Sequence, residues 1–142
     1  MKKLFLASLL ALIITSSVLL AVVEADENAE KAAQKSAVVW LALVDSSKYS
    51  ESWEEASQLF KKQVTKQQWE SALNSVRSPL GKLNSRNLKS SEYSTTLPGA
   101  PDGEYVVMQF ETSFEKKKSA IETVASMKDE EGKWRVSGYF IK

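Results

Sequence analysis

The hydrophobic pattern of this chain changes its period once, close to Pro79 and Gly81, and this change constrains the fold more than any other feature. Before this point apolar residues recur every three or four positions, which predicts helices; after it they alternate, which predicts strands. Helices followed by consecutive antiparallel strands are the order of an α+β domain. The sequence therefore predicts three N-terminal helices packed on a curved antiparallel sheet of about four strands.

The three helices are predicted from their apolar stripes and terminal residues. The first runs from Asp26, a candidate N-cap, to about Val44. Its segment "AVVWLALV" is apolar all round, which predicts burial on several sides. The second helix begins near Ser50. The third begins after Thr65, which can form a capping box with Gln68.

The strand candidates differ in how clearly their faces are marked. Lys82–Ser94 is polar, Glu104–Phe114 alternates strictly, Ser119–Met127 is shorter, and the last strand begins near Trp134. In the second strand, alternation predicts a core face made of Val106, Met108, Phe110, Thr112 and Phe114. In the last strand it predicts a core face made of Trp134, Val136, Gly138 and Phe140. The opposite face of that strand would carry Arg135, Ser137, Tyr139 and Ile141.

The N-terminal segment is typical of an export signal. Lys2 and Lys3 precede the uncharged apolar run Leu4–Val23, and small Ala25 stands at the expected cleavage position. Residues 1–25 are therefore predicted to be a signal peptide, and residues 26–142 a single domain that is periplasmic or secreted. An uncleaved anchor is the alternative, because about 20 apolar residues can span a bilayer. The membrane would then be reached only through this segment.

Two residue types are missing, and their absence excludes several chemistries. The chain has no cysteine and no histidine, so Ser–His–Asp and Cys–His catalysis and zinc sites with these ligands are excluded. No Gly-rich phosphate loop precedes a helix, and neither a cofactor nor a metal is predicted. Without the signal segment the chain has 17 basic and 17 acidic residues, because the full chain has 19 and 18 and the segment holds Lys2, Lys3 and Glu24. This balance does not favour nucleic acid as a partner.

Candidate recognition residues lie on the face of the sheet opposite the predicted core. Tyr139, Arg135 and Tyr105 would share this face, and Tyr and Arg are enriched where partners dock. We expect this face to be a recognition surface, most simply that of a two-fold homodimer. Glu111 lies on the same face and either joins Glu122 and Arg135 in an ion-pair network between strands or serves as a carboxylate base.

Three further charged residues allow two interpretations each. Arg77 and Arg86 belong to a stretch without acidic residues, which predicts either an anion-binding patch or a helix end followed by a solvated edge strand. Asp45 follows an apolar helix, where it either caps the next turn or acts as a base.

The ordered set of short motifs resembles a known family. These are "WLALVD" with Tyr49, then Ser52 and Trp53, Trp69, "RSPLG", Arg86, "PGAPDGEY", "FETSF" and "GKWRVSGY". In this order they resemble the bacterial family known as domain of unknown function 4019, over essentially all of residues 26–142. Ser47 departs from the family pattern, which favours glycine there. The resemblance implies an exported protein with a cystatin-like roll of the nuclear transport factor 2-like superfamily, and it supplies no activity.

The sequence thus predicts an exported, non-catalytic binding or interaction domain. It would bind an unknown small ligand, apolar or anionic, or a protein partner, in or on its sheet. A cofactor-free enzyme with a carboxylate base in the cone of the roll is one alternative, and a structural homodimer module is another. A closed, aromatic interior would favour the interaction domain. An open pocket in which acids, Arg and Tyr converge would favour the enzyme.

Overall fold

The computed structural model describes the backbone of residues 2–142, and it describes the burial and contacts of side chains from Val18 onward. Its helices are α1 (Lys2–Asp45), α2 (Tyr49–Glu55), α3 (Gln58–Gln63), α4 (Lys66–Val76) and the short 3₁₀ helix η1 (Ser78–Leu80). Its strands are β1 (Leu83–Ser94), β2 (Tyr105–Phe114), β3 (Lys117–Lys128) and β4 (Trp134–Ile141). The strands form one open antiparallel sheet in the order β1-β2-β3-β4. The predicted α+β class is confirmed.

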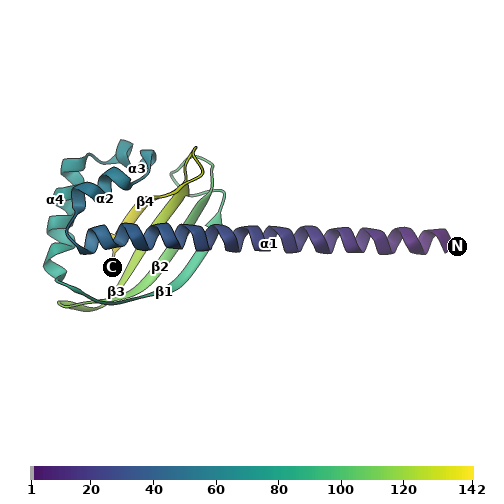
Figure 1. Ribbon diagram of the computed structural model, residues 1–142, viewed down its shortest axis with the longest axis horizontal. Coiled ribbons are helices and arrows are strands. Elements are labelled where there is room, and N and C mark those ends of the chain that lie inside the picture. The colour runs from purple at the N-terminus through teal and green to yellow at the C-terminus, as the bar shows by residue number, and fades with distance from the viewer. Residues whose placement is uncertain (1) are drawn as a thin grey trace.

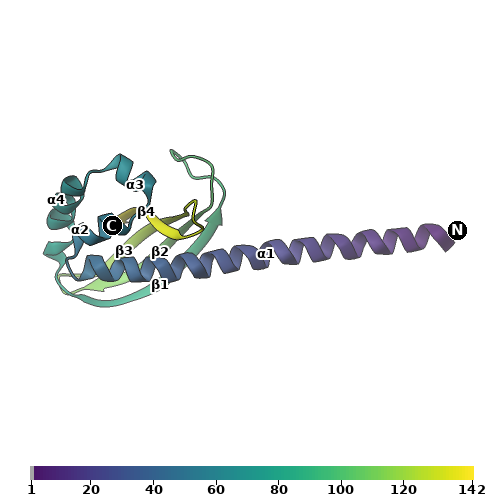
Figure 2. The same cartoon turned by 45° about the horizontal axis from the view of Figure 1, so that its top comes forward.

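The helices lie on one side of this sheet (Figure 1). The C-terminal part of α1 crosses the sheet and contacts all four strands, while α2 contacts both α1 and α4. The N-terminal part of α1 projects beyond the sheet as a continuation of the same helix (Figure 2). Among the described residues, no helix is both long and apolar enough to cross a membrane. The run Leu4–Val23 lies mostly outside the residues whose side chains are described, and cleavage after Ala25 stays a prediction.

Two of the predicted helix boundaries are wrong. Helix α1 passes through Asp26 without interruption, so this residue is not an N-cap. The predicted second helix is divided into α2 and α3, because the backbone is extended at Ala56 and Ser57. The side chain of Ser57 caps α3, and its N–H donates to the carbonyl of Val136 in β4 at 2.8 Å. The capping box that Thr65 was predicted to form at the start of α4 is confirmed.

The hydrophobic core lies between α1 and the sheet. It contains Ala33, Ala37, Trp40, Leu41 and Val44 of α1 together with Val106, Met108, Phe110, Val124 and Val136 of the strands. All five residues of the predicted core face of β2 are buried, which confirms that prediction. The segment "AVVWLALV", predicted to be buried on several sides, buries Ala37, Trp40, Leu41 and Val44, whereas Val38 is 49% exposed and Val39 is 66% exposed.

Strand β4 departs from the predicted alternation at Ser137. Ala125 pairs with Gly138 and Ser126 with Val136, so Ser137 is an extra residue in β4, a β-bulge. One inserted residue exchanges the two faces of everything that follows it. Val136 therefore faces the helices as predicted. Beyond the bulge Tyr139 faces the helices, and Phe140 faces away from them and is 59% exposed.

Tyr105 is also not the exposed residue that alternation predicted. Its side chain is fully buried, because the loop between β1 and β2 folds over it. Its hydroxyl donates to the carbonyl of Pro101 at 2.5 Å, and Gly103 lies against its ring. With Tyr139 turned inward and Tyr105 covered, the predicted recognition patch around these two tyrosines does not form.

Candidate functional site

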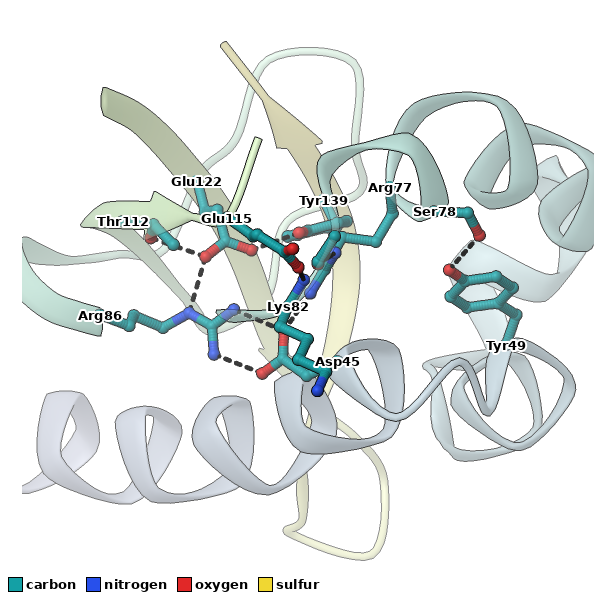
Figure 3. A network of polar contacts seen from close by, with 11 residues as sticks. Asp45, Tyr49, Arg77, Ser78, Lys82, Arg86, Thr112, Glu115, Glu122 and Tyr139 are labelled. Carbon is teal, nitrogen blue, oxygen red and sulfur yellow. Dashed lines mark hydrogen bonds and ion pairs between the residues drawn. The ribbon is translucent and has the colours of Figure 1, made fainter. Parts of the chain in front are cut away.

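Polar side chains from the end of α1, from the residue that follows α4 and from all four strands meet between the helices and the sheet (Figure 3). We call this group the polar cluster. Its members are Asp45 of α1, Arg77 after α4, Arg86 of β1, Thr112 of β2, Glu122 of β3 and Tyr139 of β4.

Arg86 is the centre of the polar cluster. Its Nε donates to Glu122 Oε1 at 2.6 Å, and its two terminal nitrogens donate to the two carboxylate oxygens of Asp45 at 2.7 and 2.9 Å. Glu122 also accepts hydrogen bonds from the hydroxyl of Thr112, at 2.7 Å, and from the hydroxyl of Tyr139. The planar guanidinium can bridge two carboxylates in this way, whereas the ammonium of a lysine could not.

Arg77, the residue that follows α4, is the second arginine of the polar cluster. Its Nη1 donates to the carbonyl of Gly81 at 2.7 Å, and its Nη2 donates to Asp45 Oδ1 at 3.2 Å. Its guanidinium carbon lies 4.4 Å from the ring centre of Phe114, a cation–π contact. Asp45 therefore accepts hydrogen bonds from two arginines rather than capping the turn that follows it, so the capping interpretation is wrong.

The polar cluster is buried and its charges balance. Glu122 is fully buried, and only 3% of Arg77 is exposed. Burial lowers the pKa of Arg86, but its hydrogen bonds to Asp45 and Glu122 and the negative charges of these carboxylates outweigh this effect and raise the pKa above its ordinary value. Burial and the adjacent negative Glu122 raise the pKa of Tyr139. Arg86 therefore stays charged and Tyr139 stays a hydrogen-bond donor, which leaves two cations against two carboxylates.

The cluster contains three of the six residues predicted as candidates, Arg77, Arg86 and Tyr139. Only 11% of the Arg86 side chain is exposed and it is paired with Glu122, so the interpretation of this residue as a solvated edge residue is wrong. Sequence analysis did not identify Glu122 as the carboxylate that accepts hydrogen bonds from Arg86, Thr112 and Tyr139. A signal for it exists in the sequence, because Glu122 falls between Ala120 and Val124 on the inward face of β3.

The other candidate residues lie elsewhere. Glu111 is exposed and 3.9 Å from Lys89. Arg135 donates to Asp129 at 2.8 Å and lies 3.5 Å from Glu55. The predicted network of Glu111, Glu122 and Arg135 is wrong, because Glu122 binds Arg86 in the polar cluster, whereas Glu111 lies beside Lys89 and Arg135 lies beside Asp129 and Glu55.

Aromatic side chains fill the interior beside the polar cluster. The rings of Trp40 and Trp69 are 6.0 Å apart, and each approaches the ring of Tyr139, at 5.4 and 6.4 Å. Phe60 packs edge-on against Trp69 at 4.9 Å. The indole N–H of Trp40 donates to the carbonyl of Ser52, and that of Trp69 donates to the hydroxyl of Ser52. The space between the helices and the sheet is thus filled by buried aromatic side chains.

A groove of about 640 Å³ opens at the surface between α1, α2 and the start of β4, and we call it the α1–α2 groove. Its apolar lining comes from Ala32, Val39, Trp40, Leu43, Trp134 and Val136. Its polar lining comes from Lys35, Ser36, Glu51, Glu54, Glu55 and Arg135. The volume lies within the range of sites that bind small molecules or side chains. Within the part of the chain that the structure describes, no three metal-ligating side chains are grouped to hold an ion.

Comparison with known proteins places this arrangement in a family. The family model described as "Protein of unknown function (DUF4019)" matches residues 36–139, which include every residue of the polar cluster. No curated protein matches the chain.

Proposed function

The chain belongs to the DUF4019 family, whose function is unknown, and we propose that it is a non-catalytic binding domain that takes its ligand or partner in the α1–α2 groove. One observation carries this proposal. The interior is closed and its charges are paired, whereas the groove is open, and the apolar side chain of Val39 in it is 66% exposed.

The geometry of the polar cluster supports binding over catalysis. A general base needs an accessible lone pair within reach of the substrate proton. Glu122 is fully buried, and its oxygens accept hydrogen bonds from Arg86, Thr112 and Tyr139. A substrate would have to break this network before it met a carboxylate. The polar cluster is therefore assigned to stability, and a cofactor-free enzyme is the less supported alternative.

The proposal includes a location and a fold relationship. The domain acts in the periplasm of a bacterium or after secretion, and the signal segment is removed near Ala25. The basic start, the apolar run and the small residue at its end support this location. The fold is a roll of the nuclear transport factor 2-like type, which is supported by a sheet crossed on one side by a long helix (Figure 1).

Two neighbouring valines give a matched test of the groove. Both are exposed on α1, but only Val39 lines the groove. We expect the purified chain to bind the uncharged apolar dye Nile red, and Val39→Glu to weaken this binding about tenfold, because a charge would then occupy the apolar floor. Val38→Glu is the control and should bind the dye like the wild type.

Fluorescence titration measures the affinity, and thermal unfolding checks that both variants remain folded. Equal dye affinity of the two variants would show that the groove is not the binding site.

A further inference from the structure

We propose that the occupant of the α1–α2 groove is a second copy of this chain, bound as a two-fold dimer in which the two α1 helices lie antiparallel. This inference rests on the proposed function of the groove as a binding site. Three features support it: a second apolar stripe on α1, two groove-lining charges that form no ion pair within the described residues, and the spacing of these charges along α1 and the start of α2.

The first feature is an apolar stripe that no element covers among the residues whose side chains are described. Helix α1 buries one side against the sheet through Ala33, Ala37, Trp40, Leu41 and Val44. A neighbouring stripe of Ala32, Val39 and Leu43 lines the groove instead, over a helix length of about 17 Å. A helix segment that is apolar all round is ordinarily buried on all sides. The exposure of Val39 therefore indicates that a partner packs along this side of α1.

The second feature is the distribution of charge along the groove. Three of the five charged residues that line it already have a partner: Glu54 pairs with Lys66, and Glu55 pairs with Arg135. Lys35 and Glu51 line the groove as well, and neither forms an ion pair within the described residues of one copy. Lys35 lies one turn from Ala32 and ten residues before the end of α1, whereas Glu51 lies in the first turn of α2, which follows that end.

The third feature is that these positions are related by a two-fold axis. Lys35 and Leu43 are each four residues from Val39, so an antiparallel pair of α1 helices centred on Val39 places Lys35 of one copy against Leu43 of the other. The N–H of Lys48, just before α2, donates to the carbonyl of Leu43 at 2.8 Å, so Glu51 in the first turn of α2 lies near the same end of α1. Each Lys35 then meets Glu51 of the second copy, and the contact occurs twice, as a self-complementary interface requires.

A charge exchange tests this arrangement by sedimentation equilibrium of the purified full chain at micromolar concentrations. We expect the wild type to dimerise. Lys35→Glu places two carboxylates opposite each other in both of the Lys35–Glu51 contacts of the dimer. Glu51→Lys places two cations opposite each other in the same two contacts. Each single variant should raise the dimer Kd by about tenfold or more, since two contacts change from attraction to repulsion. The double variant Lys35→Glu with Glu51→Lys should restore the Kd to within about threefold of the wild type.

Two control variants separate this interface from other modes of association. Lys31→Glu makes the same charge change one turn earlier on α1, outside the groove lining, and should leave the Kd unchanged. Phe140→Ser removes the exposed aromatic residue on the other side of the sheet, and it should also leave the Kd unchanged. Dissociation of the dimer by Phe140→Ser would overturn the proposal in favour of a dimer through the sheet.

The outcomes distinguish this inference from the proposed function. The dimer is overturned if the wild type stays monomeric up to about 100 µM. It is also overturned if the double variant has a dimer Kd as high as that of either single variant. If Nile red binding then still depends on Val39, the groove binds another ligand and the proposed function stands. If dye binding is independent of Val39 as well, both proposals fail.

Discussion

The interior of this protein has two halves that both lie between the helices and the sheet and are held together differently. In the aromatic half, Trp40, Trp69 and Phe60 contribute buried apolar area, and the stabilisation grows with the area removed from water. In the polar half, Arg86 and Glu122 contribute an ion network whose net value is small but whose rupture is costly. Shortening an aromatic side chain should therefore reduce the stability of the protein in proportion to the volume removed. Removing a single charge from the polar half should disrupt its whole ion network.

Tyr139 joins the two halves. Its ring packs against Trp40 and Trp69, and its hydroxyl donates to Glu122. It holds this position only because of the bulge at Ser137, since strict alternation would have turned it away from the helices. The bulge is thus the feature of β4 that connects the aromatic half with the polar half.

The largest effect is expected for Arg86→Met, which keeps most of the side-chain volume and removes the charge. Glu122, which is fully buried, would lose its cation, and Asp45 would keep only its contact with Arg77. We expect the free energy of unfolding to fall by about 3–5 kcal/mol, as measured by urea denaturation. Lys89→Met on the same strand is the control, because Lys89 is half exposed, and it should cost less than about 0.5 kcal/mol. Similar losses in both variants would contradict a special role of the polar half.

An intermediate effect is expected for Tyr139→Phe, which preserves the ring and removes the hydrogen bond to Glu122. A hydrogen bond to a charged group contributes about 1.5–3 kcal/mol, and this amount should be lost at neutral pH. Urea denaturation measures the loss. A loss below about 0.5 kcal/mol would show that the ring alone stabilises the fold.

The pH dependence of this difference gives a second measure of the same contact. The pKa of Tyr139 is raised from its ordinary value of 10.0 in the folded protein, so above this pH the unfolded chain loses the proton while the folded chain keeps it. The wild type should therefore lose about 1.4 kcal/mol of stability per pH unit above pH 10 through this group, and none below it. Phe at this position cannot titrate, so the advantage of the wild type should shrink as the pH rises. A constant difference between the two proteins would contradict the raised pKa.

The smallest effect is expected for Phe140→Ser, which tests the register of β4. Alternation from the start of the strand predicts a core phenylalanine, whose removal would cost about 3–5 kcal/mol. The bulge places Phe140 on the open side of the sheet, so we expect a change within about 0.5 kcal/mol. Calorimetric unfolding distinguishes the two values.

The sequence by itself determined the order of the elements and most of their faces. The change of hydrophobic period near Pro79 separated helices from strands, and Thr65 marked the start of α4. The inward face of β2 followed from alternation alone, because no bulge lies between Val106 and Thr112 on the pairing with β3. These features depend on interactions between residues a few positions apart, and local patterns record such interactions directly.

The tertiary structure decided which polar residues meet and which aromatic residues are covered. Asp45 and Arg86 are 41 residues apart in the chain, and Arg86 and Glu122 are 36 apart, so no local pattern links them. Tyr105 is buried by a loop, and the face of Tyr139 depends on one extra residue in the pairing of β4 with β3. Such contacts arise only when the strands pair and α1 closes over them, because desolvation then requires each buried charge to find a partner.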